Sequence, residues 1–91
     1  MIDASAKQTL CYRIFHALWN TNDATVDQLQ REVKATSSQL QSYLRHFKEV
    51  MGGELVNFRN PPGSRKYMWS MKANGRTCED MFEIFLDKKL P

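Results

Sequence analysis

The stretch of sequence that decides the fold is residues 52–71, which read GGELVNFRNPPGSRKYMWSM. The two glycines at its start are typical of a helix end. Segments 54–59 and 65–71 are rich in aliphatic and aromatic residues, the second in alternation, and each predicts a strand. Between them, the loop 60–64 holds two prolines and a glycine, which neither a helix nor a strand can run through. Residues 54–71 are therefore expected to form a β-hairpin.

Two short helices are expected directly before this hairpin. Thr25 is followed three residues later by Gln28, and Thr36 begins a second Thr-x-x-Gln pattern of the same kind. In such a capping box, the hydroxyl and the amide satisfy N–H groups that the first turn of a helix leaves free. Apolar residues then recur at helical spacing, which predicts helices over 25–35 and 37–51. The buried face of the second helix is expected to consist of Leu40, Leu44, Phe47 and Met51.

Two further helices complete the pattern. Apolar residues at helical spacing predict a first helix over 4–19 and a last helix over 77–88. The last helix is apolar over more than half of its circumference, so one side can pack on the first helix while the other is available to a second chain. A homodimer and a monomer are both compatible with this pattern. The candidate dimer-interface residues are Met81, Phe82 and Phe85.

The whole chain fits one domain. Its 91 residues suffice for one compact core, and a hydrophobic share of 42% is too high for a disordered segment. The sequence therefore predicts a single α+β domain over residues 1–91. In this domain a three-helix core carries a helix-turn-helix at 25–51, a two-stranded hairpin at 54–71 and a C-terminal helix.

The positive charge of the chain is concentrated in its middle third. The net charge is +3, and residues 36–72 carry six basic and two acidic side chains. The segment before them is neutral, and the segment after them is slightly acidic. A local basic patch is what the binding of a polyanion requires, because attraction to phosphates depends on nearby charge. The charge distribution therefore favours nucleic acid as a partner.

The outward face of helix 37–51 carries residue types that suit the major groove of DNA. Glutamine can pair with adenine, arginine with guanine, and serine with bases or phosphates, and the first two turns hold no acidic residue. A merely solvated polar face is the alternative, but lysine and glutamate usually fill such faces. Basic residues beside the hairpin loop can reach phosphates or the adjacent minor groove. The candidate DNA-binding residues are Ser37, Ser38, Gln39, Gln41, Ser42, Arg45 and Lys48 in the helix and Arg59, Arg65 and Lys66 in the hairpin.

A family resemblance is carried by Gly53-Glu54-Leu55-Val56, then Arg59, the turn, and the run from Arg65 to Arg76, which ends in Met71-Lys72-Ala73-Asn74-Gly75-Arg76. With the order of helices and hairpin, they resemble the winged helix-turn-helix superfamily, in particular small MarR- and PadR-type regulators of bacteria, archaea and phages. In those families a Gly-x-Leu-Val/Ile strand leads into a basic wing, and a Leu-Thr-x-x-Gly-Arg segment opens the next helix. Lys72 stands where threonine is usual. The resemblance implies a regulator or repressor of transcription that binds double-stranded DNA. Helix 37–51 would lie in the major groove and wing 59–66 on the backbone or in the minor groove.

A protein-interaction module is the second function that the sequence permits. The modest net charge favours it, and an adaptor or inhibitor of this kind would use the apolar last helix and the hairpin. Enzyme chemistry has no support, because His16 and His46 lack a Cys, Asp or Glu partner at ligand spacing. The sequence also lacks a glycine-rich phosphate loop after a strand and a nucleophile elbow. It therefore indicates no enzyme, metal, cofactor or small-molecule ligand.

The cysteines and the N-terminal residues indicate in which cellular compartment the protein is expected. Cys11 and Cys78 lie far apart without metal-ligand spacing, each within an apolar helical pattern, so both are expected to be buried free thiols. The sequence contains no run of the roughly 20 apolar residues that a membrane span needs, and its first residues show no secretion pattern. We therefore expect the protein in the cytoplasm, on the nucleoid when bound to DNA, or in a nucleus.

Overall fold

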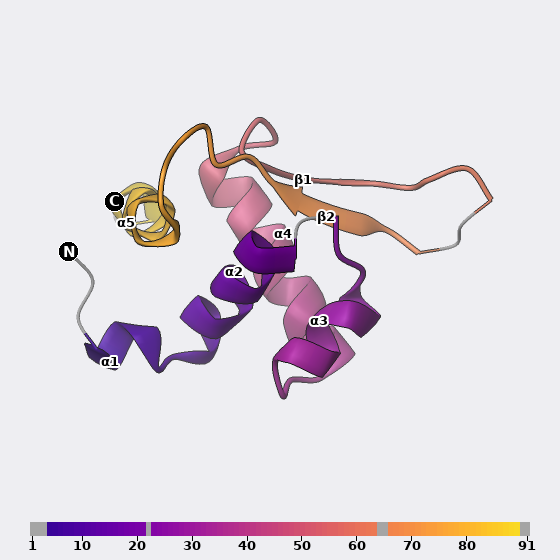
Figure 1. Cartoon of the computed structure of the whole chain (residues 1–91), viewed down its shortest axis with the longest axis horizontal. Helices are drawn as coiled ribbons and strands as arrows, with labels where there is room; N and C mark the ends of the chain where they lie inside the picture. Colours follow the sequence, from indigo (N-terminus) through magenta and orange to yellow (C-terminus); the bar gives the residue numbers. More distant parts are fainter. Residues whose placement is uncertain (1–3, 22, 64–65, 90–91) are drawn as a thin grey trace.

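The computed structural model describes residues 4–21, 23–63 and 66–89. This part of the chain is α+β, with five helices and one antiparallel hairpin, a layout compatible with the winged-helix arrangement expected from the sequence (Figure 1). Within the same ranges, no helix combines the length and the apolar character that crossing a bilayer requires. In chain order the elements are α1 (Ala4–Lys7), α2 (Leu10–Thr21), α3 (Val26–Glu32), α4 (Ser37–Met51), β1 (Val56–Arg59), β2 (Met68–Met71) and α5 (Cys78–Lys89).

The first helix is divided in two, so the prediction of one helix over 4–19 is wrong. Thr9 lies at the break, where its hydroxyl donates a hydrogen bond to the carbonyl oxygen of Ala6 at 2.7 Å. The same hydroxyl oxygen accepts a hydrogen bond from the backbone N–H of Tyr12 at 3.2 Å. Thr9 therefore ends α1 and caps the start of α2, because a threonine hydroxyl competes with the helical hydrogen bonds of the backbone.

Both predicted capping boxes are confirmed. At α3, the N–H of Gln28 donates to the hydroxyl of Thr25 at 3.3 Å, and the N–H of Thr25 donates to the amide oxygen of Gln28 at 2.9 Å. The corresponding distances between Thr36 and Gln39 at α4 are 3.1 and 3.0 Å. Helix α4 has the predicted bounds, whereas α3 ends three residues earlier than predicted because Val33 adopts an extended conformation.

The hairpin has the predicted order but shorter strands, and it has a third partner. Phe58 pairs with Trp69 in the antiparallel register of β1 and β2. On the other edge of β2, the backbone N–H and carbonyl of Trp69 both bond to those of Ala24 at 2.8 Å. No local sequence pattern predicts this bridge, because its two residues are far apart in the chain. It fixes the turn before α3 against the hairpin, and therefore determines which residues of α3 face β2.

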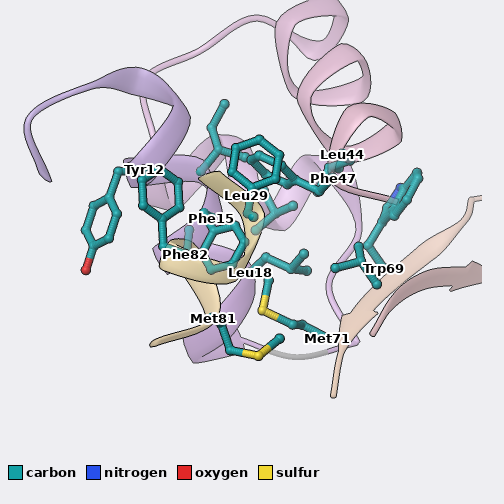
Figure 2. Packing of buried hydrophobic residues seen from close by; sticks show 14 of the residues in the cluster. Tyr12, Phe15, Leu18, Leu29, Leu44, Phe47, Trp69, Met71, Met81 and Phe82 are labelled. Atoms are coloured by element: carbon teal, nitrogen blue, oxygen red, sulfur yellow. The ribbon is translucent and has the colours of Figure 1, made fainter. Parts of the chain in front are cut away.

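The core is an aromatic cluster between α2, α4 and α5. The ring centroid of Phe15 lies 5.2 Å from that of Phe47 and 5.1 Å from that of Phe82. Trp69 and Met71 of the hairpin also belong to the buried hydrophobic cluster, and Figure 2 shows both of them beside the strands. The predicted buried face of α4 is confirmed, since all four of its residues are buried: Leu40, Leu44, Phe47 and Met51.

The candidate dimer-interface residues belong to this core, and their expected availability to a second chain is wrong. Met81 and Phe85 are 0% exposed and Phe82 is 2% exposed within the single chain. The rings of both phenylalanines contact Phe15 of α2, because closing the core of so small a domain takes the apolar side of α5 as well.

The two cysteines are free thiols, as predicted, but only Cys78 is buried, and Cys11 is half-buried. The thiol of Cys78 lies against the hydroxyl of Tyr12. Burial is the main reason that the pKa of Tyr12 is raised from 10.0 to about 12, and the charge of a Cys78 thiolate and the hydrogen bond with Cys78 add to the shift. Burial also raises the pKa of the Cys78 thiol. Folding therefore favours the protonated form of both side chains.

This shift predicts a loss of stability at high pH. Because the pKa of Tyr12 is higher in the folded chain than in the unfolded chain, its contribution is fully present below pH 10 and is lost as the pH rises toward 12. We expect the free energy of unfolding to fall more steeply in this range for the native chain than for Tyr12→Phe. Denaturant titrations of both proteins at a series of pH values test this. If the free energy of unfolding fell equally with pH in the two proteins, a group other than Tyr12 would be responsible.

Candidate nucleic-acid interface

A groove of about 380 Å³ lies between the start of α3, the outer face of α4 and strand β2 with the residues before it. Of the nine candidate DNA-binding residues that the structure describes, four line this groove, three from α4 and one from the hairpin. The described residues that line it are Val26 and Asp27 from α3, Ser37, Gln41 and Arg45 from α4, and Lys66, Tyr67 and Trp69 from the hairpin.

The spacing in the sequence explains the α4 wall of the groove. Ser37, Gln41 and Arg45 are four residues apart, so they lie above one another on one helix face. All three are exposed, whereas Leu40 and Leu44 lie on the buried side. The amide nitrogen of Gln41 donates a hydrogen bond to the hydroxyl of Ser37 at 3.2 Å, which keeps both side chains along this face.

The opposite walls depend on tertiary contacts. The bridge between Ala24 and Trp69 holds the start of α3 beside β2, and this brings Val26 and Asp27 to the groove. Trp69 itself is buried, so its contribution is an apolar wall, while Tyr67 is 52% exposed at the rim. The groove therefore combines this apolar wall with four polar or charged groups: the guanidinium of Arg45, the amide of Gln41, the ammonium of Lys66 and the carboxylate of Asp27.

The remaining candidates on α4 are exposed or partly exposed but do not line the groove. Ser38 and Ser42 are exposed on the helix surface. Gln39 is exposed as well, but its amide oxygen is already used in the capping box of α4. The ammonium nitrogen of Lys48 lies 5.6 Å from the ring centroid of Phe58, in cation–π contact with the hairpin.

The hairpin arginines differ in their positions. Arg59 follows Phe58 in β1, so it projects from the opposite face of the hairpin, because successive strand residues alternate between faces. It is exposed and pairs with Asp23, with 3.5 Å between the guanidinium nitrogen and the carboxylate oxygen. Arg65 lies outside the described residues.

Lys66 is paired as well, with the carboxylate of Asp27. Neither aspartate was a candidate from the sequence. In the count of charges both fall in the neutral first third, and only the tertiary structure brings them to the hairpin. As a result, two of the cations expected to contact phosphate already carry an anionic partner from the same chain.

Aromatic side chains form a second feature of the hairpin. Phe58 and Tyr67 are 38% and 52% exposed, and their ring centroids lie 4.9 Å apart. Phe58 also contacts Trp69 at 4.8 Å, so the aromatic face continues from the core to the rim of the groove. The alternation in residues 65–71 predicts that Tyr67 shares this face with Trp69, but it does not predict that Tyr67 is exposed.

The chemistry available elsewhere is limited. Among residues 4–21, 23–63 and 66–89, no group of three His, Cys, Asp or Glu side chains is placed to hold a metal ion. A wider depression of about 620 Å³ lies on the α2 and α5 side, lined by Tyr12, His16 and Cys78 together with the ion pair of Lys7 and Glu79. Comparison of the chain with protein-family models, curated proteins and solved structures finds no match. The groove beside α4 is the place where predicted DNA-binding residues from the helix and the hairpin come together.

Proposed function

We propose that this chain is a winged-helix protein that binds double-stranded DNA and regulates transcription, most simply as a repressor. In this proposal α4 enters the major groove, and the hairpin is the wing that contacts the adjacent backbone or minor groove. The observation that carries the proposal is the convergence of Ser37, Gln41 and Arg45 with Lys66 in one groove. These residues come from two elements that a winged helix presents to DNA on the same side.

The dimensions of the α4 face support this proposal. From Ser37 to Arg45 the helix rises by about 12 Å, at roughly 1.5 Å per residue. That length corresponds to about three to four base pairs at roughly 3.4 Å each. Arg45 can donate two hydrogen bonds to guanine, and Gln41 can bond in the same bidentate manner to adenine. One face of α4 could therefore contact the edges of several successive base pairs.

The hairpin supplies the part of the interface that is independent of base sequence. Lys66 lines the groove and is exposed, so its ammonium group could meet a phosphate oxygen beside the major groove. Lys48 lies further along α4 against Phe58, and could contact the backbone where the helix leaves the groove. Contacts of this kind position the protein, whereas the α4 face would select the sequence.

Removing the charge of Lys66 tests the role of the hairpin. We expect Lys66→Ala to weaken binding to all duplexes by a similar factor, because a phosphate contact carries no sequence information. The slope of log K against log salt concentration should flatten by about one unit, since one counterion fewer is released. Fluorescence anisotropy titrations of a labelled duplex of mixed sequence at several salt concentrations measure both effects.

Lys88→Ala is the matched control, since it removes the same charge from an exposed position on α5. The control should bind with the affinity and the salt slope of the native chain. An unchanged slope in a folded Lys66→Ala protein, or an equal change in both variants, would remove Lys66 from the interface.

A protein-interaction module is the second candidate, and the exposed aromatic pair Phe58 and Tyr67 favours it. A partner protein could cover these rings together with the apolar wall of the groove. The apolar residues of α5 no longer support this alternative, because Met81, Phe82 and Phe85 are buried in the core. Salt dependence separates the two functions: binding to phosphates weakens steeply as salt is added, whereas apolar docking changes little.

A further inference from the structure

We infer that Arg59 and Lys66 form two anion subsites that are occupied in the unbound chain by its own carboxylates, Asp23 and Asp27. A wing that enters the minor groove has a phosphate backbone on each side of it, so backbone phosphates of the bound nucleic acid would displace both carboxylates, although Arg59 lies on the hairpin face opposite Phe58. The inference rests on the proposed DNA-binding function and adds to it a competition within the chain. Carboxylate and phosphate oxygens are interchangeable in chemical terms here, because both accept charge-assisted hydrogen bonds from ammonium and guanidinium groups.

The first subsite is held by the turn between α2 and α3. Asp23 has a positive φ of 55°, a conformation in which aspartate is tolerated better than most residues. The next residue, Ala24, is bonded to Trp69 through both of its backbone groups. The carboxylate of Asp23 is thereby fixed beside the sheet, where it lies 3.5 Å from the guanidinium of Arg59.

The second subsite lies at the groove itself. Asp27 is in the first turn of α3, whose start is fixed by the capping box of Thr25. Its carboxylate pairs with Lys66, which is 39 residues away in the chain, and both side chains line the groove beside Arg45. An anion is therefore already present at the point where the proposed interface requires a phosphate.

The exposure of these pairs makes the exchange feasible. The side chains of Arg59 and Lys66 are both more than half exposed, and so is that of Asp27. Exposed ion pairs contribute little to stability, because water screens them and two long side chains must be held in place. A phosphate of the duplex can therefore replace either carboxylate at small cost. Each aspartate still lowers the affinity for DNA, because the cation must leave one anion to bind the other.

The variant Asp27→Asn tests this competition, because it keeps the size of the side chain and removes its charge. We expect it to bind a short DNA duplex of mixed sequence about two- to fivefold more tightly than the native chain at low salt. Asp23→Asn should give a gain in the same direction through Arg59. The matched control is Asp87→Asn, which removes a carboxylate from an exposed position on α5 and should bind like the native chain.

A double-mutant cycle shows whether the gain passes through Lys66. In a Lys66→Ala background, Asp27→Asn should change the affinity by less than about 1.5-fold, because the cation it competes for is gone. A gain of equal size in both backgrounds would overturn the inference, since it would indicate direct repulsion between Asp27 and the duplex. Equal affinities of Asp27→Asn and Asp87→Asn would overturn it as well. Failure of the native chain to bind any duplex at low salt is a different result, which rejects the proposed function itself. Circular dichroism spectra confirm that each variant is folded.

Discussion

Replacing Phe15 by alanine is expected to lower the free energy of unfolding by about 3–5 kcal/mol. Phe15 is 0% exposed, and its ring contacts Phe47, Phe82 and Phe85, so it joins α2 to both α4 and α5. The substitution removes these contacts and leaves a cavity that the surrounding rings can fill only in part. Because domains of this size have stabilities of about 5–15 kcal/mol, such a loss would leave a narrow margin. Urea denaturation followed by circular dichroism measures it.

The control for this experiment is Tyr67→Ala, which truncates an aromatic side chain that is 52% exposed. Its cost should be at most about 1 kcal/mol, since it loses one cross-strand contact rather than a core residue. If Phe15→Ala cost less than about 1 kcal/mol, the described core would be wrong.

Replacing Arg45 by alanine is expected to weaken binding to a preferred duplex by about 1–3 kcal/mol and to relax the base preference at one position. Arg45 is exposed on the α4 wall of the groove, one helical turn after Gln41, and it does not belong to the buried face of α4. The variant should therefore fold like the native chain. The preferred duplex is first selected from a random pool by the native chain, and both proteins are then titrated with it and with a scrambled duplex.

The control for this comparison is Arg13→Ala, which removes an exposed arginine from α2 without touching the groove. Its affinity and base preference should match those of the native chain. A folded Arg45→Ala protein that retains full affinity and full preference would show that this face of α4 does not contact bases.

Structural features formed by residues close together in the chain could be predicted from the sequence, whereas features formed by distant residues could not. The two Thr-x-x-Gln patterns placed the starts of α3 and α4 correctly, because a capping box is formed within four residues. Thr9 also forms its hydrogen bonds with residues close by in the chain. The break between α1 and α2 was not predicted, because the apolar residues around Thr9 repeat at helical spacing through it. The bridge of Ala24 to Trp69 gave no signal at all, because it joins residues far apart in the chain.

The same distinction applies to the candidate site. The α4 face could be predicted because Ser37, Gln41 and Arg45 follow the helical repeat on the side opposite the apolar stripe. Asp27 could not, because its place beside Lys66 depends on how α3 docks against β2. Charge counting along the sequence therefore overestimated the free positive charge of the hairpin.

The error at α5 came from the small size of the domain. Its apolar side was wide enough to suggest a surface for a second chain, but the helices α2 and α4 alone do not enclose the ring of Phe15. Phe82 and Phe85 complete that enclosure, and Phe82 also packs edge-on against Tyr12 at 5.0 Å. In a chain of 91 residues, the core is small enough that the whole apolar side of α5 is needed to complete it.

The most direct test of the proposed interface is a map of backbone amide chemical shifts by NMR as a short DNA duplex is added to the native chain. The proposed function predicts that the largest changes occur on the groove face, at the amides of Ser37, Gln41, Arg45, Lys66 and Tyr67, with little change in α5. Changes confined to the α2 and α5 side, around residues such as His16 and Cys78, would contradict it, and so would the absence of any change at low salt.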